Sequence, residues 1–302
     1  MAKDTDFANA VINAWNEEVT ESKPSVSSET RQITYQDGDS STSLYGHLVR
    51  RQSSVESNSD PPKSVPGVLL FHTGAGPHDV SLLWKADSLV CNEELFPEGC
   101  VVLITDILSD DVGWSWSPDR SQFNAARKQV LETLDEKGER PVLKSRIRAA
   151  LTALQTAAPE IDMDRLASLG WCLGGHSLFE MGRMNIPGMK AMITFHGVFG
   201  SVPSPNNTAE DKSQTMHESN KATILICNGD LDPFVNQETD LTNAIDTFRA
   251  NGHTVRLVNL EGAKHGFSNP AQDFNPNEAF AYNDEAARQS WSETLNLLKE
   301  TF

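Results

Sequence analysis

Short apolar runs alternate with stretches of helical periodicity from about residue 65 to the end of the chain. A strand of a parallel sheet is covered by helices on both faces, so its sequence is apolar throughout and does not alternate with polar residues. We predict strands within 66–72, 101–108, 165–171, 190–197, 221–230 and 254–260, and helices within 82–95, 122–134, 143–158 and 277–302, with further helices after residue 174 and up to residue 248.

Two shorter strands precede this pattern. Ile33–Tyr35 and Leu44–Val49 are separated by Asp37, Gly38 and Asp39, a composition typical of a turn. A hairpin places them antiparallel at one edge of the sheet. We therefore predict an α/β fold with one mostly parallel sheet of about eight strands and helices on both faces.

The first thirty residues differ from the rest. Phe7, Val11, Ile12 and Trp15 recur at helical spacing, and a polar stretch containing Pro24 follows. We expect an amphipathic helix and a connector in residues 1–30, and one domain in residues 31–302. The chain shows no internal repeat, and the serine-rich stretch 51–62 is expected to be a loop because strands continue on both sides of it.

Charge and cysteine content exclude several classes of protein. The formal net charge of −17 repels nucleic acids and anionic membrane surfaces, so we expect neither as a partner. The four cysteines have no CxxC spacing, no run of 18 apolar residues occurs, and residues 1–19 lack the apolar core of a secretory signal. These features predict a cytoplasmic protein. The sequence does not reveal its oligomeric state, and we expect a monomer or a homodimer.

The sequence Gly170-Trp171-Cys172-Leu173-Gly174 lies between a predicted strand and a predicted helix. It has the G-x-S-x-G form of a nucleophile elbow, with cysteine in place of serine. Such a turn places Cys172 at a helix N-terminus, where the helix dipole favours a thiolate. By itself the motif also fits an inert core thiol.

Candidate partners of Cys172 follow in the order nucleophile, acid, base. Asp230 and Asp232 leave one predicted strand, and His265 lies in a glycine-flanked loop after the last strand. All three sites fall at the C-terminal ends of strands, where open α/β sheets bind ligands. Asp230 and Asp232 compete for the role of the acid, with Asp230 also readable as a turn residue.

These motifs resemble the dienelactone hydrolase family of α/β-hydrolases. The resemblance rests on the cysteine elbow, on the D-P-x-V segment at 232–235, on A-K-H-G-F at 263–267 and on ITFHG at 193–197, and it covers roughly residues 30 to 300. It implies an α/β-hydrolase fold, no cofactor, and hydrolysis of lactones or esters. It also implies a triad in which Cys172 is the nucleophile, His265 the base and Asp232 the orienting acid, since Pro233 matches the family pattern.

Two positions depart from the archetypal members of that family. A glutamate that contacts the resting cysteine is replaced by Thr73, and an arginine that holds the substrate carboxylate after the histidine is replaced by Asn269. Thiolate formation and substrate anchoring are therefore expected to differ here. A neutral or differently anchored substrate is favoured over a dienelactone acid.

Other residues complete the candidate site. Backbone N–H groups of Leu173 and of Thr73 or Gly74 are expected to form the oxyanion hole. The substrate pocket is expected to include His72, Trp114, Trp116 and Arg120, although core or surface packing explains the last three equally well. His72 also reads as a packed residue below the site, and Arg120 is a candidate anion-binding residue.

The remaining histidines and the polar insertion have plainer interpretations. His176 and His196 read as hydrogen-bonded structural histidines, and no carboxylate or thiolate converges with them into a metal site. The polar insertion at 198–220 is either a lid or a surface loop.

The sequence therefore predicts a cysteine-dependent hydrolase of small esters or lactones that forms an acyl-enzyme and needs no cofactor or metal. Two other hypotheses remain open. One is a non-catalytic binding or redox-responsive protein that retains the elbow, and the other is an acyltransferase.

Overall fold

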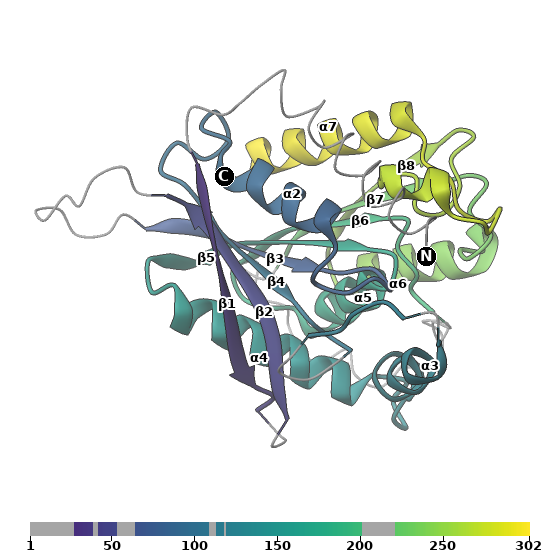
Figure 1. The fold of residues 1–302 in the computed structure, drawn as a ribbon, viewed down its shortest axis with the longest axis horizontal. Coiled ribbons are helices and arrows are strands. Elements are labelled where there is room, and N and C mark those ends of the chain that lie inside the picture. The colour runs from purple at the N-terminus through teal and green to yellow at the C-terminus, as the bar shows by residue number, and fades with distance from the viewer. Residues whose placement is uncertain (1–26, 39–41, 53–63, 109–112, 118, 201–220) are drawn as a thin grey trace, which may run out of the picture.

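The computed structural model describes residues 27–38, 42–52, 64–108, 113–117, 119–200 and 221–302. These residues form one eight-stranded sheet in the order β1-β2-β4-β3-β5-β6-β7-β8 (Figure 1). The strands are β1 (Ser28–Gln36), β2 (Ser43–Arg51), β3 (Val65–Phe71), β4 (Val101–Thr105), β5 (Ile161–Trp171), β6 (Met189–Phe195), β7 (Thr223–Gly229) and β8 (Thr254–Leu260).

The sheet is mostly parallel, as predicted. Strands β4, β3, β5, β6, β7 and β8 run parallel to one another, whereas β2 is antiparallel to both β1 and β4. The predicted hairpin is confirmed, and β1 forms the outer edge of the sheet with most of its residues at least partly exposed. The parallel strands β3 to β7 are almost fully buried, which explains their unbroken apolar sequences.

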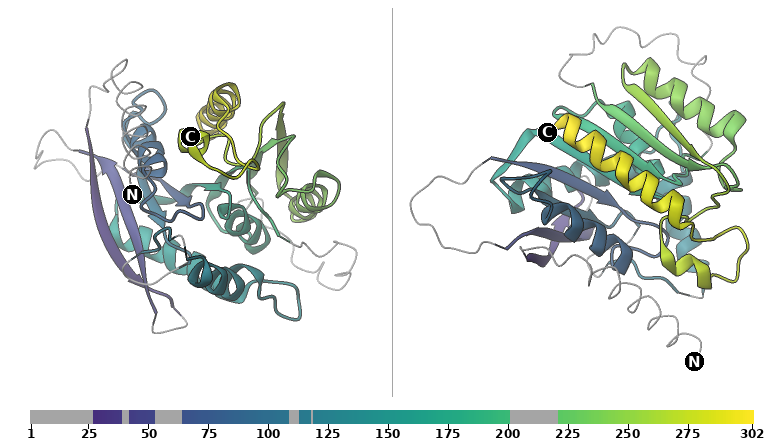
Figure 2. Two further views of the ribbon diagram at one scale, coloured as in Figure 1. Left: turned by 45° about the vertical axis from the view of Figure 1, so that its right-hand side comes forward. Right: turned by 90° about the horizontal axis from the view of Figure 1, so that it is seen from above.

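Helices cover both faces of this sheet (Figures 1 and 2). One face carries α2 (Val80–Val90) and α7 (Asp284–Thr301), while the other carries the remaining helices. These are α3 (Ser121–Arg127), the π-helix η1 (Lys128–Glu132), α4 (Pro141–Ala157), α5 (Gly174–Met184), η4 (Gln237–Leu241) and α6 (Thr242–Ala250). A short 3-10 helix, η5 (Pro270–Phe274), precedes α7.

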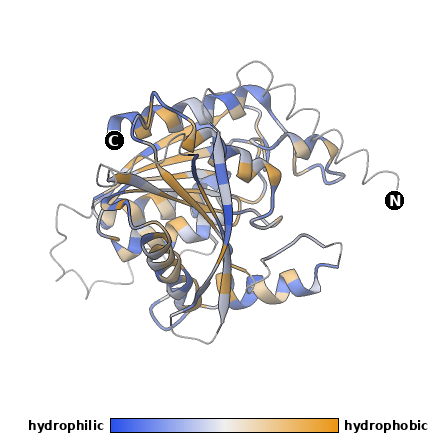
Figure 3. Cartoon of the chain, turned by 60° about the vertical axis from the view of Figure 1, so that its left-hand side comes forward, coloured by the Kyte–Doolittle hydropathy of each residue, from blue (hydrophilic) through white to orange (hydrophobic). Residues whose placement is uncertain are grey.

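Two hydrophobic cores result, one on each face. Alternate residues of β3 divide between them: Leu69 and Phe71 pack under α4 and α5, whereas Val68 and Leu70 pack under α2 and α7. Figure 3 shows the apolar residues gathered on the inner strands and on the helix faces that meet them. This double burial holds the C-terminal ends of the strands in fixed positions, and those ends carry the candidate site.

Several element boundaries differ from the predicted ones. Helix α7 begins at Asp284 and not at Asn277, because the Asn283 side chain caps it by accepting a hydrogen bond from the Ala286 N–H. Strand β1 begins at Ser28, inside the predicted connector. The predicted N-terminal helix and most of the 198–220 insertion lie outside the described residues.

The helix predicted over 122–134 is divided. It is α-helical only to Arg127 and continues as the π-helix η1 to Glu132. In the part of the chain that the structure describes, no helix has the length and apolarity required to cross a bilayer.

Candidate active site

Cys172 occupies a sharp turn between β5 and α5. Its φ of 53° is in the left-handed region, which residues with side chains rarely adopt. The backbone is held there by hydrogen bonds: the Cys172 N–H donates to the Phe195 carbonyl (3.1 Å), and the Cys172 carbonyl accepts from the N–H groups of Gly175 (3.0 Å) and Val198 (2.8 Å). The half-buried thiol therefore projects from a constrained turn.

The glycines on either side of this cysteine are required by space. A Cβ on Gly170 would lie 2.8 Å from the Gly174 carbonyl oxygen, and a Cβ on Gly174 would lie 2.7 Å from the Phe71 carbonyl oxygen. Because both contacts are with backbone, no side-chain movement relieves them. The elbow consequently packs directly against the end of β3, where the Thr73–Gly74 segment begins.

Asp232 and His265 are brought together from the ends of β7 and β8. His265 Nδ1 is 2.7 Å from Asp232 Oδ2, and both side chains are almost fully buried. The other carboxylate oxygen of Asp232 accepts a hydrogen bond from the Phe234 N–H (2.9 Å). Asp230 Oδ1 is buried without a hydrogen-bond partner among the described residues. Of the two candidate acids, Asp232 is the one that contacts the histidine.

The electrostatics of His265 depend on Cys172. Burial opposes a charge on this ring, but the influence of Cys172 and of the Asp232 carboxylate outweighs it and raises the pKa of His265 to about 10. A negative charge on the sulfur and a positive charge on the ring stabilise each other. The three side chains therefore lie together beyond the C-terminal ends of β5, β7 and β8.

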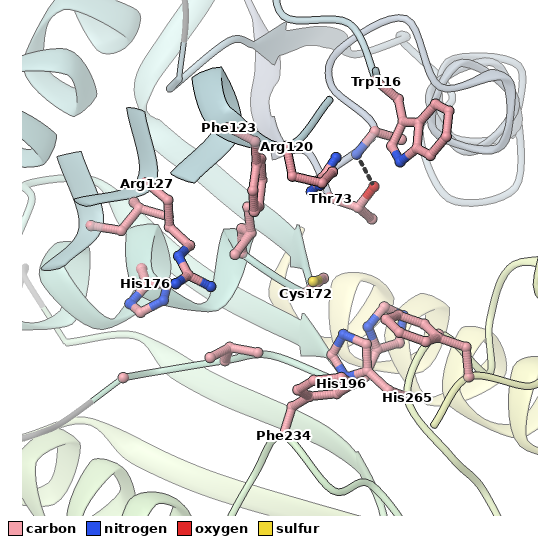
Figure 4. Close-up of a pocket in the computed structure, with 18 of the residues that line it drawn as sticks. Thr73, Trp116, Arg120, Phe123, Arg127, Cys172, His176, His196, Phe234 and His265 are labelled. Carbon is pink, nitrogen blue, oxygen red and sulfur yellow. Dashed lines mark hydrogen bonds between the residues drawn. The ribbon is translucent and has the colours of Figure 1, made fainter. Parts of the chain in front are cut away.

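Cys172 and His265 open onto a cavity of about 610 Å³ (Figure 4). Thr73, Gly74 and Leu173, whose N–H groups were expected to hold an oxyanion, also line it. Its remaining lining residues are Ala75, Trp116, Arg120, Phe123, Arg127, Leu131, Glu132, Leu134, Arg140, His176, His196, Val198, Gly200, Phe234, Gly266, Gln272, Asn275 and Phe280.

The four residues predicted for the substrate pocket divide into two pairs. Trp116 and Arg120 line the cavity, whereas His72 and Trp114 do not, so the prediction for the second pair was wrong. His72 is fully buried. Its Nε2 is hydrogen-bonded to Asp106 (3.1 Å), and its Nδ1 lies 2.5 Å from the Thr73 carbonyl oxygen. Trp114 Nε1 donates to the Gly74 carbonyl (3.1 Å). His72 and Trp114 thus contact the carbonyl groups of Thr73 and Gly74 and stabilise this segment.

One wall of the cavity is cationic. The Arg120 guanidinium stacks on the Phe123 ring at 3.8 Å, and its Nη1 is buried without a hydrogen-bond partner in the described structure. Burial and the neighbouring charge of Arg127 lower the pKa of Arg120. Arg127 itself is paired with Glu132 (2.9 Å). Arg120 therefore presents an unneutralised charge to the cavity of a protein whose formal net charge is −17.

Aromatic rings pack against His265, on the wall of the cavity that faces Arg120. Phe234 and Phe280 meet the His265 ring at 4.9 and 5.2 Å between centroids. The sequence analysis missed both residues. Phe234 was findable, because it lies two positions after Asp232, but Phe280 carried no signal. An isolated bridge between His265 and Phe280 brings it into the site.

The histidines expected to be structural both line the cavity. Burial and the charge of Arg140 lower the pKa of His176 to about 3, so this ring is neutral. His196 is 2% exposed and packs against His265. No cluster of three or more His, Cys, Asp or Glu side chains in the described residues is arranged to hold a metal ion.

The two departures from the archetypal pattern have clear structural roles. Thr73 Oγ1 accepts a hydrogen bond from the Ala75 N–H (3.1 Å), so it shapes its own loop. Asn269 caps η5 through the Ala271 N–H (3.0 Å) and does not line the cavity. A cationic group in the cavity comes instead from Arg120, at the start of α3, whose Nη1 is buried without a hydrogen-bond partner among the described residues.

A family model described as the dienelactone hydrolase family matches residues 55–302. The chain belongs to the dienelactone hydrolase family. It is accordingly an α/β-hydrolase that acts on ester bonds, and the resemblance inferred from its motifs is confirmed.

Individual members of this family and fold are similar to the chain. An uncharacterized protein of Caenorhabditis elegans, K02A2.1, is 30% identical over 175 residues, which are 56% of this chain and 99% of that protein. The crystal structure of P91, described as a dienelactone hydrolase-like promiscuous phosphotriesterase from metagenomic libraries, is 25% identical with a TM-score of 0.69, covering 91% of this chain and 99% of that one.

More distant structures share the fold alone. An acylaminoacyl peptidase of Pyrococcus horikoshii is 12% identical with a TM-score of 0.56, covering 93% of this chain and 43% of the peptidase. The α/β-hydrolase domain is thus common to enzymes with different substrates.

Proposed function

We propose that this dienelactone hydrolase family member hydrolyses small esters or lactones through a Cys172–His265–Asp232 triad. The observation that carries the proposal is the 2.7 Å contact between His265 Nδ1 and Asp232 Oδ2, on an imidazole whose pKa the neighbouring Cys172 also raises. Cys172 and His265 line a cavity large enough for a small substrate.

The first stage is acylation. The Cys172 sulfur attacks the ester carbonyl carbon, a C–S bond forms, and the carbonyl electron pair moves to the oxygen. N–H groups of Leu173 and of Thr73 or Gly74 stabilise that oxyanion. When the intermediate collapses, the C–O bond breaks and the His265 imidazolium protonates the departing alkoxide. The products are a thioester and a neutral His265.

The second stage depends on the loss of the thiolate charge. Once the sulfur is acylated, the strongest influence raising the pKa of His265 is gone, while burial still lowers it. The neutral ring then takes a proton from water as the water attacks the thioester carbonyl. Collapse of this second intermediate breaks the C–S bond and releases the acid. The thiolate and the imidazolium are restored together.

The cavity suggests a substrate with two unlike ends. Phe234 and Phe280 offer an apolar surface beside His265, and the exposed ring of Trp116 lines another part of the cavity. Arg120, on the other wall, offers buried guanidinium donors to a carboxylate or another polar group. We infer a small ester or lactone that is anchored by Arg120 and not by a residue after His265.

Substitution of the nucleophile tests the proposal. Against short p-nitrophenyl esters and simple lactones, Cys172→Ala should lose about 10²–10⁶-fold in kcat. Cys91→Ala is the matched control, since Cys91 is also half-buried but does not line the cavity. Turnover by Cys172→Ala equal to that of the wild type would exclude the triad mechanism.

Three further assays separate the alternative functions. Ester products formed with added alcohols would indicate acyl transfer in place of hydrolysis. A phosphotriester such as paraoxon belongs in the panel because P91 is described as a phosphotriesterase. Absence of all turnover, with Cys172 reacting with iodoacetamide only as an ordinary thiol does, would favour a binding or redox-responsive protein.

A further inference from the structure

His196 lies at the end of β6, in a segment that is attached to the nucleophile elbow. The residue before it accepts a hydrogen bond from the Cys172 N–H (3.1 Å), and Val198, two residues on, donates one to the Cys172 carbonyl (2.8 Å). His196 thus lies between two of the three backbone contacts that hold the strained turn of Cys172.

The backbone of His196 is itself unusual. Its φ is 41°, and it is one of three residues other than glycine with positive φ among those described, together with Cys172 and Asn185. The N–H of His196 donates to the Cys227 carbonyl (2.9 Å), which fixes this conformation. Strained backbone of this kind costs free energy and persists where the surroundings hold it, often at active sites.

The side chain of His196 joins the elbow to the loop that carries His265. Its ring meets the His265 ring edge to face at 4.8 Å between centroids, and the Phe267 ring at 5.2 Å. His196 Nε2 is hydrogen-bonded to Ser268 Oγ (3.1 Å), and both side chains are at least nine-tenths buried. One imidazole therefore contacts the base while its own backbone segment contacts the nucleophile (Figure 4).

His196 is neutral where it lies. Burial and the positive charge of His265 hold the pKa of His196 well below its usual value. The titratable and charged groups around it are the Cys172 thiol, the His265 imidazole and the Asp232 carboxylate, with Arg120 across the cavity. A neutral ring can pack on the imidazolium without repelling it.

We propose that His196, held by Ser268, is a positioning residue that keeps the His265 ring in hydrogen-bonding alignment with the Cys172 sulfur. The inference rests on the proposed function, in which those two groups react. It assigns no contact with the substrate to His196. The hydrogen bond to Ser268 fixes the His196 ring, and the edge-to-face contact of His196 then fixes the orientation of the His265 ring toward Cys172.

Two substitutions test this role. His196→Phe keeps an aromatic ring but removes the hydrogen bond to Ser268, and Ser268→Ala removes the same bond from the other side. Each should lower kcat about 10- to 100-fold, because the base is misaligned. KM should change less than about twofold, because phenylalanine keeps a ring of similar size at position 196 of the lining and Ser268 does not line the cavity. The double variant should lose no more than the worse single variant, since both remove one interaction.

A second readout does not require a substrate. The thiolate absorbance at 240 nm that disappears on alkylation of Cys172 measures how much of the thiolate–imidazolium pair is present at pH 7. We expect this signal to fall at least about twofold in His196→Phe and Ser268→Ala, and to recover in His196→Gln, whose amide can reach Ser268.

His253→Phe is the matched control for a merely structural loss. His253 is also a buried histidine with two hydrogen bonds, to the Ala222 N–H (3.1 Å) and the Gly182 carbonyl (2.8 Å), but it does not line the cavity. It should lower Tm and leave kcat and the thiolate signal near wild-type values.

Two outcomes would overturn the positioning role. One is a folded His196→Phe and Ser268→Ala with wild-type kcat and thiolate signal. The other is a loss of kcat no greater than that caused by His253→Phe at equal loss of Tm. Failure of the proposed function is distinguishable, because there Cys172→Ala would turn over substrate as fast as the wild type.

Discussion

The two walls of the cavity differ in how the chain builds them. The reactive wall consists of residues in the loops after β5, β7 and β8, so each side chain is positioned by the end of a strand of the parallel sheet. The opposite wall comes from residues 116–140, an irregular segment containing α3 and the π-helix η1. π-Helical turns are uncommon and frequently occur at functional sites. The comparison suggests that the first wall sets the reaction and the second sets the substrate.

The largest expected effect breaks the reactive wall while keeping its shape. Asp232→Asn should lower kcat about 10²–10⁴-fold, because an amide neither stabilises the imidazolium nor fixes its tautomer. Asp230→Asn, in the same loop, is the control and should stay within about twofold of wild type, since Asp230 makes no contact with His265. Equal losses in the two variants would mean that the loop and not the Asp232 carboxylate matters.

A smaller and more selective effect is expected from the opposite wall. Arg120→Met keeps the apolar stem over Phe123 and removes the charge. It should raise KM about 10-fold or more for esters that bear a carboxylate and less than about twofold for neutral esters of the same size. Arg127→Met should have a weaker effect, because Arg127 is already paired with Glu132. An equal rise in KM for charged and neutral esters would argue against anchoring by charge.

The smallest effect concerns stability. The folded-state pKa of His265, about 10, lies above its unfolded value of about 6.5, so protonation stabilises the fold. This contribution is complete below about pH 6.5 and is lost as the pH rises through about 10. Asp232→Asn removes part of it, so the difference in Tm from wild type should be widest below about pH 6.5 and narrow above pH 10. A difference that stays constant with pH would contradict the ion-pair description.

Much of the reactive wall followed from the sequence, for physical reasons. Gly170 and Gly174 are recognisable in the sequence because a side chain at either position would clash with backbone. Strand β5 is recognisable because the end of a strand buried on both faces has an unbroken apolar sequence. The sequence alone therefore predicts that Cys172, Asp232 and His265 lie at one rim of the sheet.

The opposite wall was less predictable, because its residues follow no single rule. Trp114 and Trp116 are separated by one residue, yet Trp114 faces the core and Trp116 is 59% exposed at the cavity. Phe280 enters the site through an isolated bridge in an irregular segment, which leaves no periodic trace. The start of α7 at Asp284 was missed because side-chain capping by Asn283, and not apolar periodicity, determines it.

The position of His265 after β8 affects how the protein loses activity on heating. Strand β8 is the outermost strand on its side of the sheet, and most of its residues face solvent. The loop after it is tied down by hydrogen bonds between His265 and the 279–281 segment. Cys172, by contrast, follows a central strand. Local unfolding of β8 and of the loop after it would therefore displace His265 while Cys172 and most of the helices stayed in place. Activity would then be lost at a lower temperature than the one at which the whole protein unfolds.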